Sequence, residues 1–161
     1  MKNIFFSLML LSILIGLTGC ISVESPKITH LDTDVRILSA TTVQTTSRFN
    51  IQNPNPVGMQ GSIEYDLYLK GQKFTSGVTS TIDLAPNGAA NFTLESRVDL
   101  VKALGTTAEL LAEVAAGNKS IPYKISGKFK ASLAGILVEA PVEASGDLPL
   151  PSPSSLLKIT L

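Results

Sequence analysis

Apolar and polar residues alternate along most of the chain, which is the pattern of β-strands that bury one face and expose the other. In the clearest example, residues 61–70, one face is apolar and the other polar: Ile63, Tyr65, Leu67 and Leu69 against Glu64, Asp66, Tyr68 and Lys70. Similar strand character is found over residues 35–40, 41–52, 78–84, 90–94, 123–133 and 136–142. Seven to eight short strands separated by turns at this spacing predict an all-β antiparallel β-sandwich.

Residues 99–117 differ from the rest, because their apolar side chains recur at the helical spacing of three and four. Gly105 divides this segment into two parts. Thr106 and Glu109 have the spacing of a capping box, and Gly117-Asn118 is a typical helix end. We therefore expect a short helical insertion of two helices that lies across an open end or edge of the sandwich and covers apolar side chains there.

The stretch FNIQNPNPVG, residues 49–58, is a strand that ends abruptly. Phe49 and Ile51 alternate with polar residues, and then Asn53-Pro54-Asn55-Pro56 removes two backbone donors within three residues. Either the asparagines contact a ligand or the segment turns a corner. Each proline favours extended geometry in the asparagine before it, and each asparagine side chain can hydrogen-bond the backbone two residues on. Because the segment can stiffen itself without a ligand, we expect a corner, with exposed asparagines that could still meet a partner.

The first residues have the organisation of a bacterial export signal. Lys2 precedes an apolar run from Ile4 to Leu17, which is shorter than the about 18 to 20 residues of a membrane-spanning helix. Leu17-Thr18-Gly19-Cys20 then resembles the bacterial lipobox, where the signal peptide is cut before a cysteine that carries a diacylglyceryl group. An ordinary cleaved signal, or an uncleaved anchor with an incidental cysteine, is the alternative. We divide the chain into a lipoprotein signal peptide (1–19), the lipidated Cys20 with a tether (20–30) and the β-sandwich domain (31–161).

A lipid on Cys20 implies a location in the cell envelope, with the membrane as a partner through the anchor. Ile21, rather than an aspartate, follows the cysteine, which favours the outer membrane, facing the periplasm, in a Gram-negative host. Lys124, Lys128 and Lys130 alternate with apolar residues. We interpret them as the solvated face of a strand in preference to a patch for anionic lipids.

Charge and reactive side chains exclude several classes of function. Thirteen Lys and Arg balance thirteen Asp and Glu without a basic block, which argues against nucleic acid as a partner. Cys20 is the only cysteine and His30 the only histidine, so a disulfide, a zinc cluster or a catalytic triad lacks the necessary partners. Asp32 and Asp34 fit a solvated strand face better than a catalytic pair. We expect no enzymatic activity, no cofactor and no metal site.

Several motifs together resemble the LEA type 2 domain, also called the water stress and hypersensitive response (WHy) domain. The resemblance covers about residues 33–150 and includes Phe49-x-Ile51, NPNPVG at 53–58, Tyr65-x-Leu67-x-Leu69-x-Gly71, Gly77 and Leu84-Ala85-Pro86-Asn87-Gly88. It implies a fibronectin type III-like β-sandwich, a protective role under desiccation or related stress, and no catalytic residues. The residues that it marks as structural are Asn53, Pro54, Asn55, Pro56, Gly58, Gly71, Pro86, Asn87 and Gly88.

Two functions of different classes fit this sequence. The resemblance favours a non-catalytic, membrane-anchored protector that shields client proteins or membranes as water is withdrawn. The alternative is a structural adaptor of a cell-envelope complex, in which the apolar faces of residues 99–117 dock an envelope protein. In both cases we expect a monomeric domain.

Overall fold

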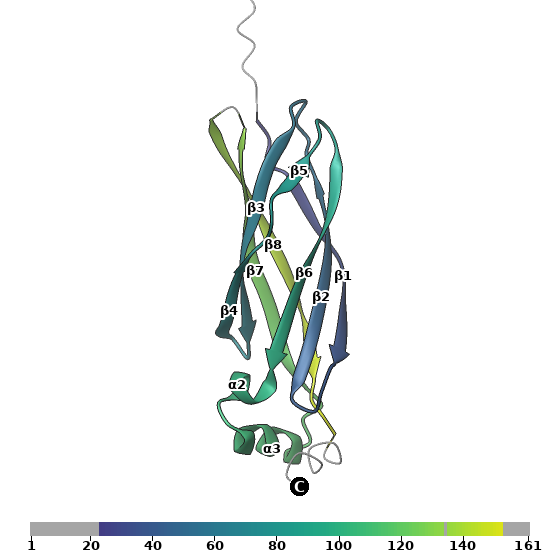
Figure 1. Ribbon diagram of the computed structural model, residues 1–161, viewed down its shortest axis with the longest axis vertical. Coiled ribbons are helices and arrows are strands. Elements are labelled where there is room, and N and C mark those ends of the chain that lie inside the picture. Colours follow the sequence, from purple (N-terminus) through teal and green to yellow (C-terminus); the bar gives the residue numbers. More distant parts are fainter. Residues whose placement is uncertain (1–22, 134, 153–161) are drawn as a thin grey trace, which may run out of the picture.

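The computed structural model describes residues 23–133 and 135–152, which form eight strands and two helices (Figure 1). In chain order these elements are β1 (Lys27–Ile37), β2 (Thr42–Gln52), β3 (Met59–Leu69), β4 (Gln72–Val78), β5 (Ile82–Leu84), β6 (Ala89–Asp99), α2 (Leu100–Leu104), α3 (Thr107–Ala115), β7 (Ser120–Leu133) and β8 (Ile136–Pro149).

The strands form two antiparallel sheets that pack face to face. One sheet has three strands in the order β1-β2-β6. The other has the order β4-β3-β7-β8, with the short β5 pairing with β3 beside β4. The long strands run most of the length of the molecule, so the sandwich is elongated (Figure 1). The predicted all-β sandwich with a short helical insertion is confirmed.

Alternation along the strands places one face of each sheet in a common core. In β3, Ile63, Leu67 and Leu69 are buried whereas Glu64 is exposed, as their spacing predicts. Phe49 of the three-stranded sheet and Phe129 of the five-stranded sheet are fully buried in the same cluster. Burial of this apolar surface is the main favourable contribution to folding.

The helices α2 and α3 close one end of the sandwich (Figure 1). Leu100 of α2 and Leu110 of α3 are buried in the core, and Lys70, in the turn between β3 and β4, forms an ion pair with Glu113 of α3. The helices therefore cover apolar side chains that the open end would otherwise expose to water. Their predicted position is confirmed.

Local signals set the ends of both helices. Asp99 caps α2 and Thr106 caps α3 through side-chain oxygens that accept hydrogen bonds from N–H groups of the first turn; for Thr106 the donor is Glu109. Gly105 between the helices has a φ of 103°, which favours glycine. The break at Gly105 and the capping pair are as the sequence predicts.

Strand β1 begins earlier than the sequence predicts. Residues 27–30 were expected to belong to the tether, but they pair with residues 49–52 of β2, so that Ile28 lies opposite Ile51. The tether predicted at 20–30 is therefore too long at its C-terminal end. The reason is that β2 supplies the backbone hydrogen-bond partners, and partners 19 to 25 positions away in the sequence leave no mark on the local pattern.

The predicted signal peptide (1–19) and Cys20 lie outside the described residues. Within the described ranges, neither helix has the length and the hydropathy that a membrane crossing requires.

Candidate functional site

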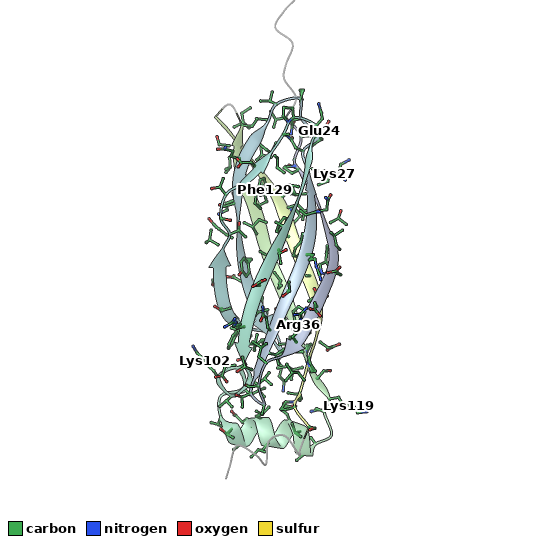
Figure 2. All side chains as sticks on the ribbon, turned by 45° about the vertical axis from the view of Figure 1, so that its right-hand side comes forward. Glu24, Lys27, Arg36, Lys102, Lys119 and Phe129 are labelled. Atoms are coloured by element: carbon green, nitrogen blue, oxygen red, sulfur yellow. The ribbon has the colours of Figure 1, made fainter. Side chains whose placement is uncertain are left out.

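The NPNP corner, which we define as residues 53–56, lies at the end of the sandwich opposite the helices. Figure 2 labels Glu24 and Lys27 at this end and Lys102 and Lys119 towards the other. β2 ends at Gln52, directly before the corner, because the two prolines have no N–H group to continue the ladder. The described chain also begins at this end.

Asn53 uses every hydrogen-bonding position of its side chain. Its amide nitrogen Nδ2 donates to the carbonyl oxygens of Val57 (2.9 Å) and Ala85 (3.0 Å). Its Oδ1 accepts from the backbone N–H of Asn55 (2.9 Å) and from the side-chain amide of the same residue (3.0 Å). Its own backbone N–H donates to the carbonyl of Gly88 (2.8 Å). When every donor and acceptor of a buried amide is hydrogen-bonded, the amide stabilises the one backbone conformation that provides these partners.

Asn55 holds the segment that precedes β1. Its Oδ1 accepts from the N–H of Glu24 (2.8 Å), and its Nδ2 donates to the carbonyl of Glu24 (2.8 Å). The side chain therefore pairs with both backbone groups of one residue, much as a neighbouring strand would. Its backbone carbonyl also accepts from the N–H of Asn87 (2.8 Å).

The two asparagines thus join three segments that are distant in sequence: the start of the domain at Glu24, the β2–β3 connection, and the β5–β6 turn. This turn is closed by a hydrogen bond from the N–H of Gly88 to the carbonyl of Ala85 (3.0 Å), and Asn87 within it has a φ of 49°. Asparagine tolerates this left-handed region better than most residues.

The other three glycines of the family motifs, Gly58, Gly77 and Gly71, occupy positions that favour glycine for different physical reasons. A β-carbon on Gly58 would lie 3.2 Å from the carbonyl oxygen of Leu84, so the corner packs closely against β5. Gly77 in β4 leaves room for the ring of Tyr65, because a β-carbon there would lie 2.5 Å from its Cζ. Gly71 has a φ of 80° in the β3–β4 turn, towards the other end of the sandwich. The structure brings residues 53–58 and 86–88 together, and it places Gly71 away from them.

The expectation that the asparagines are exposed is wrong. Asn53 and Asn55 each have only 2% of their surface accessible, because the polar groups of Glu24, Ala85 and Gly88 surround them. Their side-chain donors and acceptors are occupied within the chain. A shallow hollow at the corner is lined by Asn53 and Pro54 together with Lys27, Gln52 and residues 87–89, but the amides of the two corner asparagines are not free to bind a ligand there. The corner joins segments and presents no reactive group.

His30 is held at the edge of the core. Its Nε2 lies 2.9 Å from the Oγ1 atom of Thr33, which in turn lies 2.9 Å from the hydroxyl of the buried Ser47. The imidazole ring also contacts Phe49, with a centroid separation of 5.1 Å. These contacts give the histidine a packing role.

The outer face of the five-stranded sheet carries cross-strand ion pairs around a second shallow hollow. They are Lys130–Glu64 (2.6 Å), Lys128–Glu139 (2.8 Å), Lys124–Glu143 (3.2 Å) and Lys73–Asp66 (2.8 Å). The hydrogen bond from Lys73 lowers the pKa of Asp66, and the hydrogen bond from Lys128 lowers the pKa of Glu139. The lysines of β7 therefore belong to a solvated face, as predicted, and each exposed pair contributes little to stability.

Sequence reasoning missed the role of Glu24. The residue takes part through its backbone N–H and carbonyl, which every residue type except proline carries, and it is 31 positions from Asn55. A local pattern contains no signal for such a contact. The pairing of Asn53 with the backbone of Asn55, by contrast, is the contact that the asparagine-proline repeat predicts.

Comparisons with known proteins agree with this architecture. A sequence model of the family described as Late embryogenesis abundant protein (LEA_2) matches residues 48–146, a range that includes the NPNP corner and the turn at 85–88. No curated protein matches the chain significantly.

Three solved structures of similar fold are informative. The solution structure of a protein assigned to the late embryogenesis abundant (LEA) group has 17% identity and a TM-score of 0.57, covering 96% of this chain and 88% of its own. A solution structure from Arabidopsis thaliana has 15% identity and a TM-score of 0.56, covering 81% and 85%. A crystal structure from Archaeoglobus fulgidus has 13% identity and a TM-score of 0.52, covering 80% and 97%. At these identities the likeness concerns the fold alone.

Proposed function

Because the chain belongs to the late embryogenesis abundant protein family LEA_2, we propose that it is a non-catalytic protein that protects other proteins or membranes when water is withdrawn. The proposal includes the water stress (WHy) type of LEA_2 domain and a lipid anchor at Cys20 in the cell envelope. The main support for it is the match over residues 48–146, which spans the corner, β6 of the three-stranded sheet and nearly all of the five-stranded sheet.

The chemistry of the corner supports a non-catalytic role. Asn53 and Asn55 direct their amides at backbone groups of the chain itself, so the most distinctive motif is used for folding. Among the described residues, no three His, Cys, Asp or Glu side chains are grouped in a way that would hold a metal ion.

The ion-paired face of the five-stranded sheet suggests how protection works. Lysine and glutamate side chains from neighbouring strands alternate there, and serines such as Ser126 lie among them. Such a face offers both donors and acceptors and carries little net charge. As water is removed, these groups can replace hydration on the surface of a client protein, and an envelope location would bring the face close to membrane proteins.

The adaptor function is the second candidate, but the helices supply less support for it than the sequence suggested. Leu100 and Leu110 are buried in the core, and Val101, Leu104 and Val114 pack against it. The apolar faces that would dock a partner therefore already close the sandwich. Leu111, 47% exposed, is the large apolar side chain that α3 leaves open.

A deletion strain separates these two functions. We expect it to lose survival after drying or freezing and to keep normal envelope integrity in unstressed growth, with rescue by the unaltered gene. An envelope defect in unstressed cells, together with a co-purifying partner, would favour the adaptor and overturn the protector.

The anchor has its own test. We expect Cys20→Ser to appear in the soluble fraction or as an uncut precursor, whereas the unaltered protein is found in the membrane fraction. A Cys20→Ser protein that is still processed and membrane-bound would overturn the anchor. The purified Cys20→Ser chain should also reduce aggregation of a test enzyme during drying, compared with an unrelated protein at the same mass concentration.

A further inference from the structure

The end of the sandwich at which the described chain begins is formed by three loops without a charged side chain. They comprise residues 53–58 of the β2–β3 connection, residues 85–88 of the β5–β6 turn, and residues 135–137 at the β7–β8 hairpin (Figure 1). We call these residues the tip. Glu24 and Lys27 flank it in Figure 2.

The tip exposes apolar side chains that the fold does not use. Val57 is 46% exposed, Ile136 50% and Leu137 67%. Ile136 and Leu137 are neighbours in a strand, so their side chains point to opposite faces, and yet both are open to solvent. Leu133, which pairs with Ile136, is buried. Ile136 therefore lies at the end of the core, opposite Leu133, whereas Leu137 lies on the outer face of β8, directly before the buried Val138.

The opposite end differs in its charge. It also exposes apolar residues, Ile37 and Leu111 among them, and Figure 2 labels Arg36, Lys102 and Lys119 in this half of the molecule. A surface that enters the interface of a bilayer has to bury apolar groups without burying charges. No residue of the tip itself is charged, and Glu24, Lys27 and Asp83 beside it are exposed, so that they can stay in the headgroup layer.

The length of the chain before Val23 limits what can cover the tip. Three peptide units connect Cys20 to Val23 in the sequence, and they can span at most about 11 Å. Asn55 fixes the next residue, Glu24, through its two backbone hydrogen bonds. A lipid on Cys20 would thus hold the tip against the headgroups and leave little room for another protein between them.

We infer that the tip is a second membrane contact, in which Val57, Ile136 and Leu137 enter the interface of the bilayer to which the lipid of Cys20 is attached. This inference rests on the proposed lipid anchor. Its consequence is an upright orientation, with the corner at the membrane and the helices α2 and α3 farthest from it.

The absence of tryptophan from the sequence allows a direct test. Leu137→Trp introduces a single fluorophore at the tip, and Leu111→Trp, also at an exposed leucine, is the matched control on α3. The lipidated mature variants, which begin at Cys20, are reconstituted in phosphatidylcholine vesicles with or without bromine on the acyl chains, and flotation measures how much protein is anchored. Thermal melting of each variant confirms that it is folded.

We expect the emission of the Leu137→Trp variant to shift to shorter wavelength on vesicles and to lose intensity with brominated lipid. The emission of the Leu111→Trp variant should stay unchanged under both conditions. Adding Ile136→Ser to Leu137→Trp should reduce the loss of intensity, because the hairpin then has less apolar surface to bury.

Three outcomes would contradict the inference in different ways. Flotation of the Leu137→Trp variant without quenching would overturn the tip contact and leave the anchor intact. Failure to float would overturn the anchor, and the tip contact with it. A blue shift without quenching, with the mass doubled in sedimentation, would assign the tip to a second copy of the chain and also overturn the inference.

Discussion

The Oδ1 atom of Asn53 accepts two hydrogen bonds from the same residue, Asn55: one from its backbone N–H at 2.9 Å and one from its side-chain amide at 3.0 Å. Pro54 lies between them and has no N–H that could compete. The pair is buried, and each partner also binds a segment that is far away in the sequence, at Ala85 and at Glu24. The asparagine-proline repeat is therefore the point at which three segments of the sandwich are joined.

Asn53→Ala should destabilise the fold strongly. It removes four side-chain hydrogen bonds and leaves the carbonyls of Val57 and Ala85 without this donor. We expect a loss of roughly 2 to 4 kcal/mol in denaturant unfolding. Asn91→Ala is the control, since it removes an exposed amide pair, Asn50–Asn91 (2.9 Å), and should change stability by less than about 0.5 kcal/mol. If Asn53→Ala and Asn91→Ala lowered the free energy of unfolding equally, burial of the Asn53–Asn55 pair would not contribute to stability.

Asn55→Ala should release the start of the domain. The N–H of Glu24 loses its acceptor, and that residue lies in no strand, since β1 begins at Lys27. We expect its amide to exchange with solvent faster while amides in the middle of β2 keep their protection, as measured by hydrogen exchange. Unchanged exchange at Glu24 would mean that another contact holds this segment.

Replacing both Pro54 and Pro56 with alanine should lower stability through the unfolded chain. Pro54 is half-buried and Pro56 is exposed, so little packing is lost. The unfolded chain gains backbone freedom, and we expect a loss of about 1 kcal/mol or somewhat more, visible as a lower melting temperature. If the double variant melts unchanged but fails to protect cells during drying, the corner would have a binding role after all.

Thr45→Val should stabilise the protein. The hydroxyl of Thr45 is fully buried in β2 and has no hydrogen-bond partner in the described part of the chain. Valine has nearly the same shape and removes the desolvated polar group, so we expect a gain of about 1 kcal/mol in unfolding free energy. Thr46→Val, on the other face of the same strand, is the control and should have a smaller effect. If Thr45→Val lowered the free energy of unfolding, the hydroxyl of Thr45 would have a hydrogen-bond partner in solution.

Stability should decrease in acid. Hydrogen bonds from Lys73, Lys70 and Lys128 lower the pKa values of Asp66, Glu113 and Glu139 respectively. A carboxyl whose pKa is lower in the folded state stabilises the fold above its unfolded pKa, and this contribution disappears as the pH falls through the folded value. We expect the melting temperature to fall below about pH 4.5. The effect should be modest because the pairs are exposed, and Lys70→Gln should reduce the part that depends on Glu113, which also accepts a hydrogen bond from Asn118. A melting temperature that stays constant down to about pH 2 would contradict this assignment.

The sequence by itself determined the features that depend on neighbouring residues. The period of two in β3 predicted which side chains enter the core, because successive residues of a strand point to opposite faces. Gly105 and the Thr106–Glu109 pair predicted where the helices break and begin, since a cap joins groups within one turn. The end of β2 before residues 53–56 followed from the missing N–H groups of proline.

Only the tertiary structure decided the features that depend on distant backbone groups. Residues 27–30 become a strand because β2 lies beside them, and Asn55 is buried because Glu24, 31 positions earlier, pairs with its amide. Backbone N–H and carbonyl groups are nearly the same in every residue, so the sequence does not mark which of them will meet. The exposure of Ile136 emerged only from the structure: it alternates with the buried Val138, Ala140 and Val142, yet it lies at the end of the sheet and is 50% exposed. The outward position of Leu137 follows from the same alternation.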